Sequence, residues 1–202
     1  MGKARIWGQR NTGVGLGCNN SGIHQNAAQA VAVVRKALDV GINVLDMAGE
    51  HGSGLEESLV AEALGPRRKG VIIATKWGQD EILGLKGGDT IFSEDKTRQG
   101  ASGRWIMQAV EESLKRLKTD YIDPYQVHVA DPETPREETL RARNDLVREA
   151  KVRALGEAAT FATPDDRNTS QAIAAANGLT PFATMEANCS ILLRNAEKPI
   201  IQ

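Results

Sequence analysis

The chain has only two cysteines in 202 residues, Cys18 and Cys189, and they lie far apart. Two cysteines make no disulfide framework, and neither belongs to the Cys-x-x-Cys pairs of metal-binding or thiol-exchanging sites. We therefore expect no structural metal, no disulfide-stabilised fold and a reducing compartment.

An excess of one charge and long apolar runs are also missing. The 25 Lys and Arg residues nearly balance the 26 Asp and Glu residues, so the formal net charge is −1. Nucleic acids and anionic membranes require a clustered basic face, and no stretch approaches the roughly eighteen apolar residues of a membrane span. The first residues have no apolar signal-peptide core, and Ile6 stands where myristoylation needs Ser or Thr. The sequence favours a cytoplasmic protein without a nucleic-acid or membrane partner.

What is present is an alternation of short apolar runs with longer amphipathic segments. The apolar runs predict strands over 14–17, 43–48, 71–77, 121–129, 152–158 and 183–190. The amphipathic segments predict helices over 27–40, 56–64, 103–118, 135–150 and 166–177. Ser102 is expected to cap the third helix, and Thr134 with Glu137 is expected to form a capping box at the fourth.

Alternating strands and helices predict parallel βαβ units, arranged either as a doubly wound sheet or as a barrel. Gly13, Gly15 and Gly17 do not have the Gly-x-Gly-x-x-Gly spacing of a dinucleotide-binding turn, which also leads almost directly into its helix. The pattern therefore favours an α/β fold of the (β/α)8 TIM-barrel type, with about six strands and five helices in this chain.

Polar residues stand at the ends of three successive predicted strands: Asp46, Lys76 and His128. Because barrel active sites lie at the C-terminal ends of the strands, these side chains are candidates for a proton-transfer site. Each also has a structural explanation, as a turn Asp, a Lys that reaches water and a hydrogen-bonded His. The pattern alone leaves both interpretations open.

The motifs around these residues resemble those of the aldo-keto reductase family. GINVLD at 41–46, followed by Ala48 and by GSG at 52–54, resembles the first family signature. ATKWG at 74–78 resembles its lysine strand, and LKTDYID at 117–123 with YQVH at 125–128 resembles its histidine strand. The resemblance runs from about Gly15 to Arg194. It implies a (β/α)8 barrel that reduces aldehydes and ketones by hydride transfer from NADPH.

The family's site is a tetrad in which Tyr protonates the carbonyl oxygen, Lys paired with Asp lowers the Tyr pKa, and His orients the substrate. The resemblance assigns Asp46, Lys76 and His128 to three of these roles, but His51 stands where the family has Tyr. An imidazolium donates protons near neutral pH, yet its reference pKa is about 6.5 against about 10 for Tyr. Because Lys76 favours the neutral ring, we expect reduction to weaken above mildly acidic pH.

The resemblance also implies the cofactor-binding positions. They fall on Gly17, Cys18, Asp46, Ala158, Ala159, Glu186 and Cys189. Two alanines replace the family's Ser-Asn pair for the nicotinamide amide, Glu186 replaces a Gln, and Cys189 replaces a ring-stacking Tyr. Alanine side chains form no hydrogen bonds and cysteine offers little stacking area, so these departures weaken the nicotinamide site.

Other departures concern the fold. Pro124 lies in a central predicted strand, where it removes a ladder donor. Glu157 and Arg143 stand at positions expected to be apolar. We interpret residues 1–202 as one barrel domain, incomplete at its C-terminus because a closed barrel needs eight strands. We expect its open strand edges to find a further copy or a missing C-terminal segment.

The leading hypothesis is an NADPH-dependent reductase of a small carbonyl compound. The alternative is a diverged, non-redox barrel that acts as a regulatory or binding module, because His51 and the altered cofactor positions favour it. A third possibility, a split barrel completed by another chain, depends on length alone.

Overall fold

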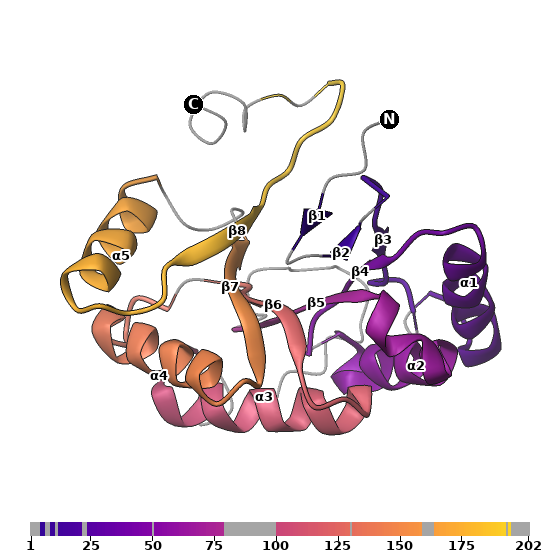
Figure 1. Cartoon of the computed structure of the whole chain (residues 1–202), viewed down its shortest axis with the longest axis horizontal. Helices are drawn as coiled ribbons and strands as arrows, with labels where there is room; N and C mark the ends of the chain where they lie inside the picture. The colour runs from indigo at the N-terminus through magenta and orange to yellow at the C-terminus, as the bar shows by residue number, and fades with distance from the viewer. Residues whose placement is uncertain are drawn as a thin grey trace.

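One six-stranded parallel sheet forms the centre of the protein. The computed structural model describes residues 5–6, 9–10, 12–21, 24–49, 51–78, 100–129, 131–158, 164–192 and 194. The strands are β3 (Leu16–Gly17), β4 (Val44–Asp46), β5 (Ile72–Trp77), β6 (Ile122–Val127), β7 (Val152–Ala158) and β8 (Phe182–Glu186). Each strand pairs with the next along the chain, and the sheet curls (Figure 1). The predicted parallel βαβ units are confirmed.

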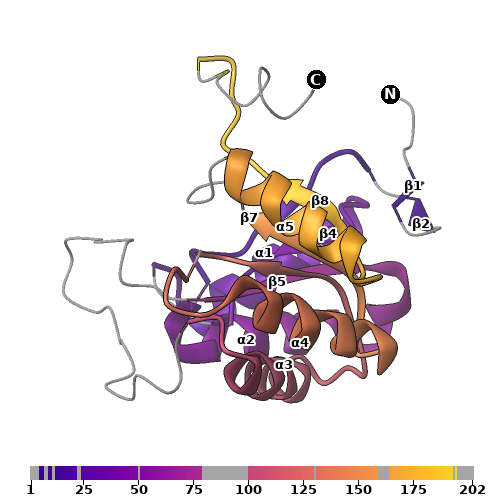
Figure 2. The same ribbon diagram turned by 90° about the vertical axis from the view of Figure 1, so that its left-hand side faces the viewer.

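Among the described residues, five α-helices cover the outer side of this curled sheet, each packed beside the next. They are α1 (Ala27–Asp39), α2 (Leu55–Leu64), α3 (Gly103–Leu117), α4 (Arg136–Arg148) and α5 (Pro164–Ala176). Figure 2 shows α3 and α4 side by side along one side of the sheet. Two 3₁₀ turns, η1 (His51–Gly54) and η2 (Gly65–Gly70), flank α2. The sequence analysis missed a short antiparallel pair, β1 (Arg5–Ile6) with β2 (Gln9–Arg10).

The helix caps follow the sequence at α3 but not at α4. The Ser102 hydroxyl accepts the Trp105 amide at 3.3 Å, as predicted for an N-cap. The capping box predicted at Thr134 is wrong, because α4 begins after Pro135 without a side-chain cap. Thr134 instead donates its hydroxyl to Asp131 at 2.7 Å, which commits its oxygen to the preceding loop.

The core lies between the sheet and the helices. Large apolar side chains from β4, β5, α3 and α4 are fully buried there, among them Leu45, Ile73, Trp77, Ile106 and Leu146. Burying each such side chain contributes roughly 1.5–3 kcal/mol. Within the described ranges, no helix combines the length and the apolar character needed to cross a membrane.

The strand β6 contains a proline and, next to it, a buried carboxylate. Pro124 pairs in register with Ala154 of β7, so the expectation that a central strand excludes proline is wrong here. The preceding Asp123, 1% exposed, accepts the Ile73 amide of β5 at 2.9 Å. A side chain of β6 thus supplies an acceptor for the β5 backbone beside the residue that lacks an N–H.

Two arginines neutralise this carboxylate. Arg68 of η2 lies 3.0 Å from Asp123, and Arg153 of β7 donates to it at 3.0 Å. The resulting network joins the N-terminal ends of β5, β6 and β7. Because all of its strand residues stand near strand beginnings, it lies at the end of the sheet opposite Asp46 and Lys76.

The two other unexpected charges interact with each other. Arg143 of α4 is 1% exposed, donates to the Gly156 carbonyl at 2.6 Å and lies 4.2 Å from the Phe182 ring centre. Burial lowers the pKa of Arg143 while Glu157 opposes that shift, and burial raises the pKa of Glu157 while Arg143 opposes it. The charges of Arg143 on α4 and Glu157 on β7 therefore partly offset each other inside the fold.

The strands β3 and β8 form the edges of the sheet, and within the described residues each pairs on one side only. Unpaired strand edges bind other strands. We therefore expect the 202-residue chain, produced alone, to associate with itself and to unfold over a broad temperature range. Sedimentation velocity and calorimetry would test this, and a monomer with a sharp cooperative transition would contradict it.

Candidate active site

Most of the predicted site residues lie together at one end of the sheet, where the six strands have their C-termini. The residues at or just after these ends are Gly17, Asp46, Lys76, His128, Ala158 and Glu186. The prediction that the strands of Asp46, Lys76 and His128 are parallel neighbours in chain order is confirmed. Polar groups from separate strands therefore meet at the C-terminal end of the sheet.

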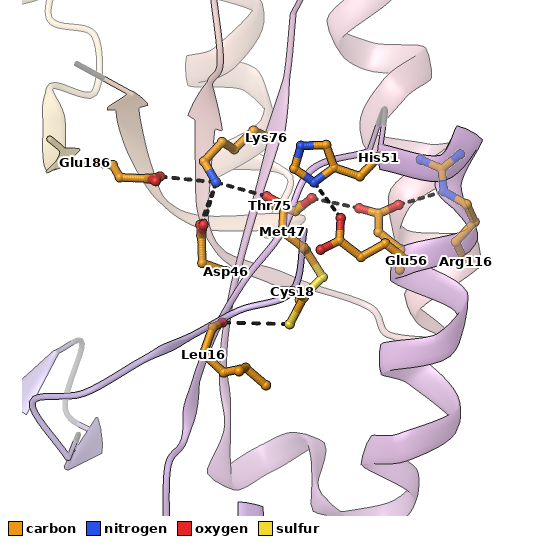
Figure 3. A network of polar contacts seen from close by, with 11 residues as sticks. Leu16, Cys18, Asp46, Met47, His51, Glu56, Thr75, Lys76, Arg116 and Glu186 are labelled. Atoms are coloured by element: carbon orange, nitrogen blue, oxygen red, sulfur yellow. Dashed lines mark hydrogen bonds and ion pairs between the residues drawn. The ribbon is translucent and has the colours of Figure 1, made fainter. Parts of the chain in front are cut away.

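Lys76 is the centre of the polar cluster. Its ammonium lies 2.7 Å from each carboxylate oxygen of Asp46 and donates to the Met47 carbonyl at 3.2 Å. A second carboxylate, Glu186 from β8, lies 3.1 Å from the same nitrogen (Figure 3). The predicted Lys76–Asp46 ion pair is confirmed, whereas the contact with Glu186 was not foreseen. Lys76 is only 4% exposed, so its ammonium is held among these partners rather than in solvent.

Burial and charge act in opposite directions on this pair. Burial tends to lower the pKa of Lys76, but the carboxylates of Asp46 and Glu186 outweigh it and raise that pKa. Burial raises the pKa of Asp46, partly opposed by Lys76 and reinforced by Glu186. Lys76 therefore stays an ammonium throughout the physiological pH range, while Asp46 protonates more readily than an ordinary Asp.

His51 begins η1 and lies against an acid that sequence reasoning missed. Its Nδ1 is 2.6 Å from Oε2 of Glu56, a fully buried residue in the first turn of α2. The His51 ring also meets the His128 ring edge-on, with ring centres 5.7 Å apart. The sequence predicted that Lys76 lowers the pKa of His51 and that Asp46 partly opposes this shift. It did not predict the contact with the Glu56 carboxylate, which favours the protonated ring.

The neighbouring Glu57 holds the start of α2 against the sheet. It accepts the Thr75 hydroxyl of β5 at 2.8 Å and the Arg116 guanidinium of α3 at 2.6 Å. Gly54, just before α2, has φ +85° and a Cβ there would lie 2.4 Å from Arg116. Only glycine allows this backbone and this close approach, and together these contacts fix the segment that carries His51.

The other expected cofactor-binding positions fall into three groups. Cys18 is buried just after β3, where burial and then Glu56 and Asp46 raise the pKa of its thiol. Ala158 is buried at the end of β7, whereas Cys189 is exposed beyond β8. Ala159 lies outside the described residues. In the described part of the chain, no group of three His, Cys, Asp or Glu side chains is placed to hold a metal ion.

The nicotinamide site can be tested against the chemistry of Glu186. Its side chain is 48% exposed at the same edge as Asp46 and Lys76. A carboxylate accepts hydrogen bonds and so suits the amide N–H group of a nicotinamide. Glu186 therefore fits this group, whereas Ala158 offers it no side-chain hydrogen bond, and Oε2 of Glu186 also accepts from Lys76 and Gln126.

Comparisons with known proteins agree with this geometry. The model of the aldo/keto reductase family matches residues 13–202. The chain belongs to the aldo/keto reductase family. Aldo-keto reductase AMT2 of Alternaria alternata is 35% identical over 189 residues, covering 86% of this chain and 51% of that protein. Versiconal hemiacetal acetate reductase of Aspergillus parasiticus is 34% identical over 202 residues, covering 92% and 58%.

A solved structure supports the fold of this aldo/keto reductase chain. The holo form of aldo-keto reductase AKR11C1 from Bacillus halodurans matches with a TM-score of 0.72 and 30% identity. The match covers 95% of this chain and 58% of that one. The curled sheet is therefore part of a (β/α)8 barrel, and the chain spans about half the length of the curated relatives it matches. The family supports an oxidoreductase role.

Proposed function

We propose that the protein reduces aldehydes or ketones to alcohols by hydride transfer from NADPH. The observation that carries this proposal is the ion pair between the buried Lys76 and the half-buried Asp46. His51 is close enough to act on the charge of Asp46, and its ring meets the His128 ring edge-on. An ammonium stabilises developing negative charge and an imidazolium supplies a proton, as carbonyl reduction requires. Both fungal relatives are named reductases, which supports the direction of the reaction.

Four residues carry the proton transfer and the substrate contacts in this proposal. His51 gives a proton to the carbonyl oxygen, and His128 orients the substrate. Lys76, held by Asp46, stabilises the charge that develops on the oxygen. A reduced nicotinamide, when bound, supplies the hydride.

The remaining positions would hold the cofactor. We assign this role to Gly17, Cys18, Asp46, Ala158, Ala159, Glu186 and Cys189. We assign the protein a small carbonyl compound as partner and, for the unpaired edges of β3 and β8, a further copy of the chain or a C-terminal segment. Two distant cysteines favour a cytoplasmic location.

The second candidate is a non-redox barrel that binds rather than reduces. The contact between Glu186 and Lys76 favours it, because the carboxylate oxygen that binds Lys76 is then less available to accept a hydrogen bond from a nicotinamide amide. Binding of NADPH, measured by its fluorescence on adding the protein, separates the two candidates. No binding would favour the non-redox barrel.

Turnover of a reactive aldehyde with NADPH is expected to fall as pH rises. If the imidazolium of His51 is the donor, the active fraction drops about tenfold for each pH unit above its titration midpoint. The substitution His51→Tyr is expected to keep turnover through neutral pH, because Tyr stays protonated to about pH 10. Loss of NADPH absorbance across pH gives both profiles. A wild-type rate that stays level from neutral to alkaline pH would show that His51 is not the donor.

A further inference from the structure

Glu56 and Glu57 are adjacent, and both are fully buried, but they serve different partners. Glu57 uses one oxygen for Thr75 and the other for Arg116, so the charge of Arg116 compensates its own. Glu56 contacts His51 through Oε2 at 2.6 Å, and its Oε1 has no hydrogen-bond partner among the described residues. A buried carboxylate is costly unless a positive charge or hydrogen bonds offset it. The group placed to offset the charge of Glu56 is the imidazole of His51.

We propose that Glu56 is a positioning residue for His51, so that the proton donor of this protein is a Glu56–His51 pair. This inference rests on the proposed reductase function. Glu56 holds Nδ1 of the ring, which fixes the ring orientation and keeps the Nδ1 proton on the side of the carboxylate. The proton that reaches a substrate is then the one on Nε2, on the side of the ring away from Glu56 (Figure 3).

The proton transfer balances within this pair. As the carbonyl carbon gains a hydride, the carbonyl oxygen takes the Nε2 proton of the imidazolium. The ring becomes neutral and keeps its Nδ1 proton against the Glu56 carboxylate. Water then returns a proton to Nε2 before the next turnover.

Four other titratable groups lie on the neighbouring elements of the site. Asp46 at the end of β4 senses the charge of His51, and the positive Lys76 stands beside it on β5. His128, after β6, meets the His51 ring directly. The buried Cys18 thiol, after β3, senses both Glu56 and Asp46. Because Lys76 is already paired with Asp46 and Glu186, Glu56 is the carboxylate that decides the charge of His51.

The first test needs no activity. The chain has three histidines, His24, His51 and His128, which nitrogen-15 NMR resolves and single substitutions assign. We expect neutral His51 to carry its proton on Nδ1 in the unmodified chain, and a proton on Nε2 would overturn the proposal. In Glu56→Gln the titration midpoint of His51 is expected to fall by about one pH unit or more, while that of His24 stays constant. An unchanged His51 midpoint would also overturn it.

Glu57→Gln is the matched control, because it removes an adjacent buried charge that does not contact His51. We expect it to lower the unfolding temperature and leave the His51 midpoint within about 0.3 pH units, since the removed charge belongs to the Arg116 pair. If Glu56→Gln does not fold, Glu56→Asp keeps the charge and is expected to retain the Nδ1 proton. An equal midpoint shift in both glutamine variants would mean a general packing effect and would contradict the proposal.

The second test uses turnover. In Glu56→Gln the alkaline fall of the rate is expected at lower pH, with about a tenfold loss near pH 7.5. In the His51→Tyr background the same substitution is expected to leave the pH profile unchanged, and a shift there would contradict the proposal. An inactive protein whose His51 still responds to Glu56 would refute the reductase function alone. An active protein with an unresponsive His51 would refute the pairing alone.

Discussion

Replacing Lys76 with methionine is expected to lower carbonyl reduction by about 10²- to 10⁴-fold, the range typical of a lost group in proton-transfer catalysis. The ammonium is buried and forms ion pairs with Asp46 at 2.7 Å and with Glu186 at 3.1 Å. Without the ammonium, the carboxylates of Asp46 and Glu186 repel the negative charge that develops on the carbonyl oxygen. Steady-state rates with NADPH and an aldehyde measure the loss.

The substitution Lys76→Arg tests whether charge alone suffices. It keeps the charge but does not fit a compact ammonium site, so we expect intermediate activity. Because the pKa of Lys76 is raised, the charge persists well above neutral pH and does not cause the alkaline fall in rate. Because the pKa of Asp46 is raised, we also expect the rate to fall at acidic pH. Asp46 then takes up a proton and loses its ion pair with Lys76. A Lys76→Met variant with more than a tenth of the original rate would exclude Lys76 from the site.

Replacing Asp123 with alanine is expected to destabilise the protein by about 3 kcal/mol, because the buried groups that bind its carboxylate lose their partner. The Ile73 amide loses its acceptor, and Arg68 loses the carboxylate 3.0 Å away. Arg153 is 40% exposed and can turn to water, so it adds little to the loss. Urea unfolding followed by circular dichroism measures the change in the free energy of unfolding.

Asp120 offers the control for this substitution, because it is exposed and lies only three residues away. Asp120→Ala is expected to change the free energy of unfolding by no more than about 0.5 kcal/mol. We also expect the folded fraction of Asp123→Ala to keep its turnover, since the network lies at the opposite end of the sheet from Lys76. A loss below about 1 kcal/mol would show that the buried carboxylate is not a structural anchor.

The strand and helix order was predictable because it follows from local periodicity, and so was the meeting of Asp46 with Lys76. Both residues end neighbouring parallel strands, and that topology alone brings them together. The contact of Glu186 with Lys76 was not predictable, because it depends on how far the sheet curls between β5 and β8. Pro124 was misjudged because the rule against proline concerns the one lost N–H, while β6 keeps its register with β7 on both sides of that residue.

The role of Glu56 was missed although His51 and Glu56 are only five residues apart. Sequence alone does not show that η1 turns the imidazole back onto the first turn of α2. The two adjacent glutamates looked equivalent as residues at a helix start, and only their different partners distinguish them.

The placement of the donor has a consequence for protein engineering and for divergence within this fold. Asp46, Lys76 and His128 come from three strands, so altering their geometry means altering the sheet. His51 and Glu56 instead sit on one contiguous hexapeptide, 51–56, that the sheet does not contain. Exchanging these six residues therefore transfers the proposed acid with its carboxylate into another barrel, provided that barrel keeps the Glu57 contacts with Thr75 and Arg116 that hold this segment. The pH dependence of such an enzyme can then change without a change in the sheet that forms its scaffold.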